Sequence, residues 1–289
     1  MNCKRTACFL IIVSLIFPVT AAFGVEAAKK FGLKPGFNFF SKDKDVELGK
    51  EASGEVDKQV PLMDDAETVR YLNDLGHRLV QYEPLPADYS WQFKVVNTRD
   101  INAFALPGGF IYVNRGTIEA AENEAQLAGV IAHETGHVVM RHGTHEASQR
   151  LLAEAPLSIL GGMFGQSSSL ASQLTQMGLG FGLNSVLLHN SRTAESQADA
   201  VGTYVLYHAG YDPHAMAQFF QIIEKKYPTR TLQFFSDHPI PENRIQAVDK
   251  QIPELGPAIQ GKTDSPEFQA VKRRMLGMPP PPPEKKTAE

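Results

Sequence analysis

Apolar residues recur three or four positions apart over most of this chain, which is the spacing of an amphipathic helix. The pattern predicts helices over residues 43–83, interrupted near Pro61, and another from Ser191 to near Gly210. Asp212 and Pro213 are typical of the start of a further helix, with Asp as its cap. We expect these apolar positions to face the core: Leu48, Val56, Val69, Leu72, Leu75, Leu79, Met216, Phe219, Phe220 and Ile223.

A different pattern, strict alternation of apolar and polar positions, appears between residues 91 and 113. Trp91–Asn97 and Asn102–Leu106 alternate as strands do. The sequence Pro107-Gly108-Gly109 then turns the chain into Phe110–Val113, which predicts a hairpin. The expected fold class is therefore α+β and predominantly α-helical, with a small β-sheet or hairpin directly before the helix near residues 123–140.

That helix carries the most informative motif of the chain, HExxH, in which His133 and His137 are four residues apart. Positions i and i+4 lie on one face of a helix, so both imidazoles can bind one zinc ion. Glu134 is then placed to deprotonate a zinc-bound water. The pattern also occurs by chance, but two features favour a buried helix here. Asn123 and Gln126 resemble a capping box, and few charges surround the histidines.

A catalytic zinc site needs a third protein ligand and an open position for water. The candidate is Glu195, which follows the helix cap Ser191 and shares one helix face with Asp199. Two solvated acids would be the ordinary alternative. Ala198 and the small or apolar residues that follow indicate instead that this face is buried, where carboxylates need a partner. Asp199 then fits a supporting role, accepting the free ring N–H of a zinc-bound histidine.

These motifs resemble the gluzincin metallopeptidases of the HtpX, BepA and CAAX-prenyl-protease type. The resemblance rests on HETGH followed by SRxxExxAD and covers about residues 42–250, without a tetratricopeptide extension. Further matching stretches are Val46–Lys50, Tyr71–Asn73, Asn102–Gly109, Asp237–Pro239 and Arg244–Ile245. The resemblance implies a zincin-type metallopeptidase domain with one Zn²⁺ per chain, bound by His133, His137 and Glu195.

The resemblance also assigns roles outside the zinc ligands. A strand at the sheet edge lies beside the cleft in this family, and a substrate peptide can pair with it. The candidate edge comprises Asn102, Ala103, Phe104 and Ala105, although a purely structural hairpin is the alternative. His238 either occupies the open zinc position at rest or stabilises the oxyanion. Arg244 either serves the oxyanion or pairs with a carboxylate. We interpret His142 and His145 as helix-end or solvent-facing residues rather than a second metal site.

The two ends of the chain differ in composition from its centre. Residues 1–22 carry Lys4 and Arg5 before a short apolar stretch and predict a secretory signal, with an N-terminal anchor as the alternative. Both cysteines, Cys3 and Cys8, lie within it, so disulfide and thiolate sites are not expected in the mature protein. Residues 28–260 are the expected peptidase domain. Residues 261–289, which contain a five-proline run, are expected to be a disordered tail, and residues 161–182 a mobile Gly/Ser-rich segment.

Composition narrows the function further. The formal net charge of −4 over 289 residues argues against a nucleic-acid partner. We expect a periplasmic zinc endopeptidase that cleaves unfolded or misassembled exported proteins, or else one anchored in the membrane and facing the periplasm. An association with the envelope membrane or the outer-membrane assembly machinery fits this interpretation. The alternative is a chaperone-like assembly factor whose proteolysis is self-inhibited or secondary. Intact Glu134 favours the enzyme, and the ligand types argue against a purely structural zinc domain.

Overall fold

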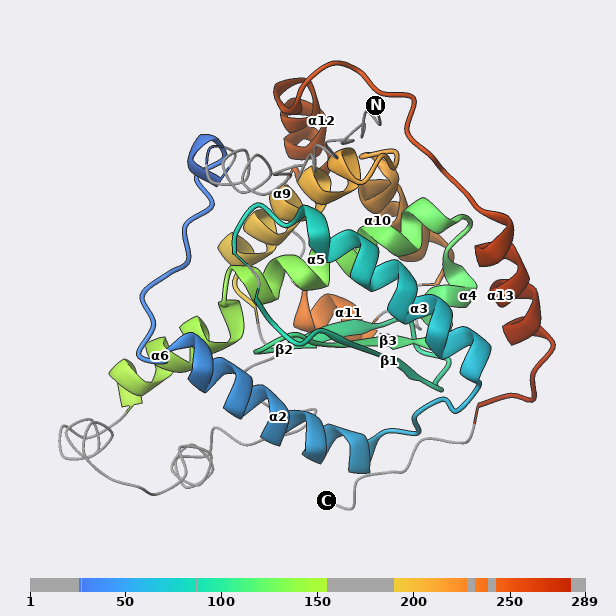
Figure 1. The fold of residues 1–289 in the computed structure, drawn as a ribbon, viewed down its shortest axis with the longest axis horizontal. Helices are drawn as coiled ribbons and strands as arrows, with labels where there is room; N and C mark the ends of the chain where they lie inside the picture. The colour runs from blue at the N-terminus through green and yellow to red at the C-terminus, as the bar shows by residue number, and fades with distance from the viewer. Residues whose placement is uncertain are drawn as a thin grey trace, which may run out of the picture.

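Helices enclose a small sheet on both of its faces in the computed structural model (Figure 1). The structure describes residue 26 and residues 28–86, 88–154, 190–227, 232–238 and 243–281. The predicted signal and the Gly/Ser-rich segment at 161–182 therefore lie outside the described residues. The predominantly α-helical α+β fold is confirmed.

The sheet has three strands: β1 (Gln92–Val96), β2 (Ala103–Leu106) and β3 (Phe110–Asn114). Their order is β1-β3-β2, with β1 parallel and β2 antiparallel to β3, so the predicted hairpin is confirmed and β2 forms one edge. Gly108 and Gly109 in the turn have φ angles of 77° and 99°, a region that favours glycine. A Cβ on Gly108 would lie 2.6 Å from the Cα of Val46, so α2 also demands a glycine there.

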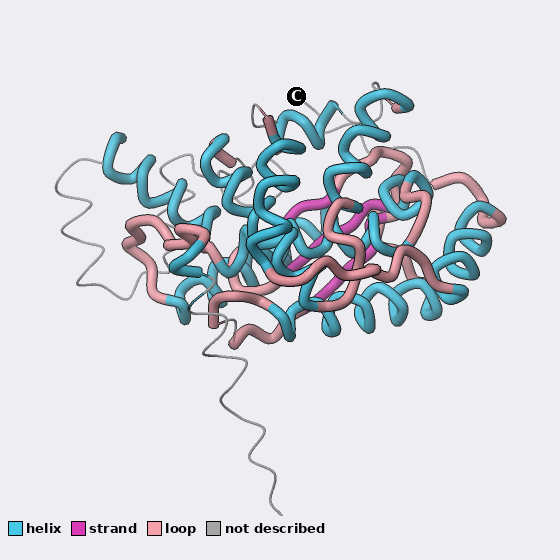
Figure 2. The backbone as a smooth tube through the Cα atoms, turned by 90° about the horizontal axis from the view of Figure 1, so that it is seen from above, coloured by secondary structure: helices cyan, strands magenta, loops and turns pink. Residues whose placement is uncertain are grey.

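Alternating side chains of the sheet face two separate cores. Phe104, Phe110 and Tyr112 pack with Leu48 and other residues of α2 (Lys42–Gln59). The intervening residues, such as Ile111, face the larger core formed with α3 (Ala66–Leu79) and α5 (Glu124–Val139). Figure 2 shows the strands in the middle of the molecule, between helices. Successive side chains of a strand point to opposite faces, and in β2 and β3 both sets are apolar and mostly buried, so the sheet has helices on both faces.

The motif helix α5 lies at the centre, and all of its residues are buried. It starts as the sequence predicts: Asn123 accepts a hydrogen bond from the Gln126 amide, while the Gln126 side chain accepts one from the Glu122 amide. Helices α9 (Arg192–His208) and α10 (Ala215–Lys226) pack against it. A Cβ on Gly136 would lie 3.1 Å from the Cβ of Val201, so this glycine lets α9 approach closely.

The other elements complete the helical layers around α5. These elements are η1 (Val80–Tyr82), α4 (Arg115–Ala120), α6 (His142–Glu154), α11 (Leu232–Asp237), α12 (Arg244–Leu255) and α13 (Pro266–Leu276). None of the helices among the described residues has the length and apolarity needed to span a membrane.

Two predictions about segment boundaries are wrong. The expected disordered tail at 261–289 contains helix α13, whose Phe268 is fully buried; residues 282–289 lie outside the described residues. The proline run masked the apolar spacing of Phe268, Val271 and Met275, which anchor this helix in the core. Helix α10 begins at Ala215 rather than at Pro213, and Asp212 accepts a hydrogen bond from the His214 amide in the turn before the helix.

Candidate metal centre and active site

The two motif histidines bring their ring nitrogens together on the cleft side of α5. The Nε2 atoms of His133 and His137 lie 3.0 Å apart, and both side chains are buried. Helix α9 crosses α5 at this point and inserts Glu195 between them. One Glu195 oxygen lies 3.3 Å from His133 Nε2 and the other 3.2 Å from His137 Nε2.

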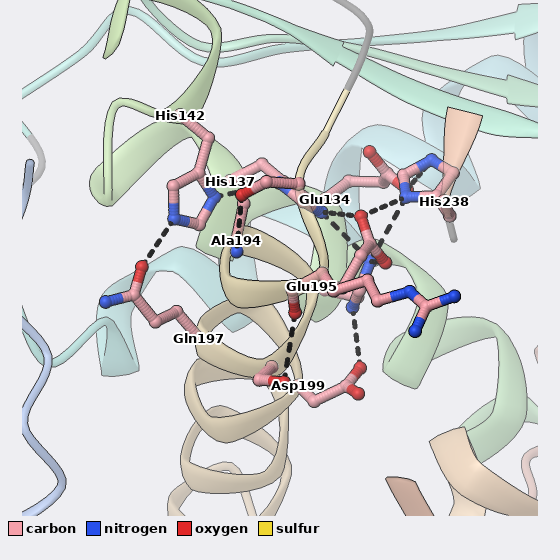
Figure 3. A network of polar contacts seen from close by, with 12 residues as sticks. Glu134, His137, His142, Ala194, Glu195, Gln197, Asp199 and His238 are labelled. Carbon is pink, nitrogen blue, oxygen red and sulfur yellow. Dashed lines mark hydrogen bonds and ion pairs between the residues drawn. The ribbon is translucent and has the colours of Figure 1, made fainter. Parts of the chain in front are cut away.

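His238, the residue directly after α11, joins this group (Figure 3). Its Nδ1 lies 3.0 Å from Glu195 Oε1 and 3.4 Å from His133 Nε2. Its Nε2 faces the other way and lies 3.3 Å from the carbonyl oxygen of Ala103 on β2. His238 therefore contacts both the histidine cluster and the edge strand.

The donor set fits a metal ion. One donor atom each from His133, His137, Glu195 and His238 lie within 4.8 Å of one another. Two ligands bound at about 2.0–2.2 Å to one tetrahedral ion lie roughly 3.3–3.6 Å apart, close to the spacings above. Imidazole nitrogens with a carboxylate suit zinc and similar divalent ions. The cluster is thus able to bind a metal ion.

The carboxylate of Glu134 lies beside this cluster without a hydrogen-bond partner among the described residues. Both of its oxygens are buried, and the nearest charged or titratable contact is His238 Nε2 at 3.5 Å. Burial raises the pKa of Glu134 above its usual value. Together with His137 and His238, it lines a cleft whose opposite wall is β2, at Phe104 and Ala105. A buried carboxylate facing a cleft is available to accept a proton.

Asp199 and Arg244 support the cluster from behind. Asp199 Oδ1 lies 3.0 Å from His133 Nδ1, the ring nitrogen that points away from the cluster. Arg244 donates from Nε to Asp199 at 2.6 Å and from Nη2 to Glu195 at 3.1 Å. Its guanidinium also stacks over the Phe220 ring, 4.2 Å from the centroid. Arg244 thus pairs with two carboxylates of α9 in this structure.

The charges in this site oppose one another. Burial favours neutral His133, but Glu195 and Asp199 outweigh it and raise the His133 pKa to about 10. Burial lowers the pKa of His137 well below its usual value. Burial of Glu195 disfavours its charge, yet the three histidines hold its pKa well below the usual range. Carboxylates outnumber guanidinium groups among the described residues around the cluster, which favours a bound cation.

Sequence reasoning missed two residues that support the cluster, His142 and Gln197. His142 is buried rather than solvent-facing, with its Nδ1 2.9 Å from His137 Nδ1 and its Nε2 3.0 Å from the Gln197 side-chain oxygen. His145 does lie near the surface, where its ring contacts the Phe37 carbonyl. The spacing of five residues between His137 and His142 gave no signal, because a continuous helix places such positions on different faces.

Of the four predicted edge residues, Phe104 and Ala105 line the cleft. Asn102 precedes β2, and its carbonyl accepts a hydrogen bond from the Asn114 amide of β3. Since main-chain groups alternate in direction along a strand, those of Ala103 and Ala105 point to the free edge. Phe104 instead stacks on Tyr112, with ring centroids 4.7 Å apart, and belongs to the core beneath the sheet.

Comparison with known proteins agrees with this arrangement. The family described as Peptidase family M48 matches residues 66–252, which include every residue of the cluster. The chain belongs to peptidase family M48.

Curated relatives of this M48 chain come from bacteria and from mitochondria. The beta-barrel assembly-enhancing protease of Escherichia coli strain K12 is 28% identical over 283 residues, which is 95% of this chain and 57% of the relative. The mitochondrial metalloendopeptidase OMA1 of Schizosaccharomyces pombe is 29% identical over 225 residues, covering 75% and 64%. OMA1 of Bos taurus is 30% identical over 200 residues, covering 62% and 36%. The chain thus spans little more than half the length of the bacterial relative.

Proposed function

We propose that this protein is a zinc-dependent endopeptidase that hydrolyses unfolded or misassembled exported proteins. The observation that carries the proposal is the four-donor cluster with the buried carboxylate of Glu134 beside it, which has no hydrogen-bond partner among the described residues. Membership of peptidase family M48 supports the same activity. A pure binding protein has no use for a buried base at this position.

In this proposal His133, His137 and Glu195 hold one zinc ion per chain, and Asp199 orients His133 through its Nδ1. Zinc bound there would supply a Lewis acid and lower the pKa of water to around 7. Glu134 accepts a proton from the attacking water and passes it to the leaving amine. Ala103 and Ala105 offer main-chain groups that hold the peptide extended beside the metal.

The alternative function, a chaperone-like assembly factor with self-inhibited proteolysis, is favoured by one observation. His238 Nδ1 lies 3.0 Å from Glu195 Oε1, so it stands where a catalytic site keeps a position for water. The same contact fits a resting state of a protease. We therefore regard His238 as a brake on the endopeptidase rather than as evidence for a second function.

The cell compartment and the domain limits are part of the proposal. Residues 1–22 act as a secretory signal, cleaved or retained as an anchor, and the mature protein works in the periplasm. One relative is named for enhancing β-barrel assembly, which supports envelope proteins as substrates. The peptidase domain begins near residue 28 and includes α13, because Phe268 packs in the same core as α5.

The experiment compares the mature protein with its Glu134→Gln variant on unfolded casein, with and without a chelator. We expect one zinc per chain in both proteins by elemental analysis, but casein hydrolysis by the wild type alone. Chelation should abolish the wild-type activity, and added zinc should restore it. A stably folded globular protein, offered in place of casein, is the specificity control and should not be cleaved.

Two results would contradict the proposal. Glu134→Gln digesting casein as fast as the wild type would exclude Glu134 as the base. A Glu195→Ala variant with full zinc affinity would remove that residue from the metal site.

A further inference from the structure

His142 and Gln197 form a contact chain that ends on one motif histidine. His142 Nδ1 lies 2.9 Å from His137 Nδ1, and His142 Nε2 lies 3.0 Å from Gln197 Oε1. The His142 side chain is buried, and Gln197 is half-buried on α9. These contacts therefore join α5 to α9 through the ring of His142, the first residue of α6 (Figure 3).

The direction of the protons along this chain follows from the metal site proposed above. His137 Nε2 faces the cluster and must carry a lone pair to bind a metal, so a neutral His137 carries its proton on Nδ1. Two ring nitrogens 2.9 Å apart share one proton, so His142 Nδ1 accepts it. His142 then carries its own proton on Nε2 and donates it to the Gln197 oxygen.

The opposite direction is chemically excluded in a metal-bound protein. A flipped Gln197 amide would donate its NH₂ to His142 Nε2, and His142 would donate from Nδ1 to His137. His137 would then hold its proton on Nε2, directed at the cluster. The orientation of one side-chain amide on α9 is thus linked to the tautomer of a metal ligand on α5.

We propose that His142 and Gln197 are positioning residues that fix His137 in its metal-binding tautomer and ring orientation. This inference rests on the proposed function, because it takes His137 as a ligand through Nε2. The two motif histidines, His133 and His137, are then held by different kinds of supporting group. His133 is supported by the carboxylate of Asp199, and His137 by a neutral relay.

A break in the helix places His142 in contact with His137. In a continuous helix a residue five positions on lies about 140° around the axis. Arg141 interrupts the helix with a φ angle of 59°, after which α6 starts at His142. The Arg141 side chain pairs with the buried Asp45 and donates to the Phe40 carbonyl at 2.6 Å, which holds this backbone conformation in place. The left-handed conformation of Arg141 therefore places the His142 ring against His137.

The test separates a hydrogen-bond acceptor from a space-filling ring. His142→Phe keeps a ring of similar size but cannot accept a proton, while His142→Gln offers an amide oxygen to His137 and an amide N–H to Gln197. Zinc affinity is measured by competition with a chromophoric chelator, and folding by circular dichroism of the metal-free proteins. We expect His142→Phe to lose about 10–100-fold in affinity and His142→Gln to recover most of it. His145→Phe, on the same helix but away from the ligands, is the matched control and should bind as the wild type does.

A double-mutant cycle tests the relay as a unit. Gln197→Ala should lower zinc affinity in the wild-type background and have no further effect in the His142→Phe background. Additive losses would overturn the relay, and so would a folded His142→Phe protein with wild-type affinity. Tight binding by His142→Phe with weak binding by His142→Gln would show that His142 only fills space. A wild-type protein without zinc affinity would instead contradict the metal site itself.

Discussion

Three glutamates on or near α5 differ in pKa because their surroundings differ. Burial disfavours the charge of Glu124, but donors including Lys262 and Tyr211 lower its pKa below the usual value. Glu134 has no hydrogen-bond donor among the described residues, and burial raises its pKa. Glu83 follows η1 and faces the Thr135 hydroxyl of α5, and burial of its carboxyl raises its pKa to about 8. Its neutral form is thus preferred in the folded protein.

Glu83 should make the stability of the folded protein fall as the pH rises. The unfolded chain releases this proton near the usual value of 4.5, whereas the folded protein retains it to about pH 8. Between these values the folded state binds more protons, so its free energy of unfolding decreases by up to about 1.4 kcal/mol per pH unit. Glu83→Gln removes this contribution and should be stabilised relative to the wild type at pH 8 but not at pH 4.

Urea unfolding of the metal-free wild type and Glu83→Gln at pH 4, 6 and 8 measures the difference. Glu51→Gln, at an exposed position on α2, is the control and should follow the wild type. Parallel pH profiles for the wild type and Glu83→Gln would show that Glu83 does not titrate differently on folding.

At the level of elements, a substrate strand and His238 would compete for the free edge of β2. The carbonyl of Ala103 points to the free edge of the sheet, where a substrate strand would pair with it. His238 Nε2 lies 3.3 Å from that oxygen, and the same ring contacts Glu195. Pairing of a substrate with β2 is therefore expected to require that His238 moves away from both.

Replacing His238 by alanine should raise the basal rate of casein hydrolysis, because it frees the metal and the Ala103 carbonyl together. The rate would no longer be limited by the population of molecules in which His238 has moved away from Glu195 and Ala103. His77→Ala, at an exposed position on α3, provides the control rate. A lower rate in His238→Ala would show instead that His238 stabilises the oxyanion, and an unchanged rate would exclude both roles.

At the scale of the whole molecule, the C-terminal segment is fastened to the start of the motif helix. Lys262 donates to Glu124 at 2.6 Å, and the Ser265 hydroxyl also hydrogen-bonds to this carboxylate. Tyr71 of α3 donates to the same group at 3.0 Å. Arg115 of α4 holds the end of α13 by donating to the Met275 carbonyl at 2.5 Å. Residues beyond the M48 match at 66–252 thus help to hold α5 in place.

Truncation after residue 260 should strongly destabilise the protein, because it exposes the core contacts of α13 and leaves Glu124 buried without its lysine. The milder variant Phe268→Ala should lower the free energy of unfolding by about 3–5 kcal/mol, as expected for a fully buried phenylalanine. Thermal unfolding followed by circular dichroism measures both. Removal of residues 282–289 alone is the control. A protein truncated after residue 260 that unfolds at the wild-type temperature would show that α13 is an appendage.

Local patterns in the sequence were enough to predict the fold class and most elements. The helix period before residue 83, the alternation around β1–β3 and the glycine turn at 107–109 each depend on a few neighbouring residues. The i, i+4 pairs on α5 and α9 are equally local, so the sequence alone pointed to His133, His137, Glu195 and Asp199. Sequence reasoning failed at α13, where it took the proline run as representative of the whole segment.

Contacts between distant segments were decided by the tertiary structure alone. His142 reaches His137 because Arg141 adopts a left-handed conformation that residue type does not predict, and Gln197 meets them from a helix 55 positions away. The tertiary structure likewise brings Arg244 to Asp199 and Glu195, which lie 45 and 49 positions away in the sequence. Propensity and periodicity report the few residues around a position. Which side chains meet across a core depends on how whole helices pack, and that is a property of the folded chain.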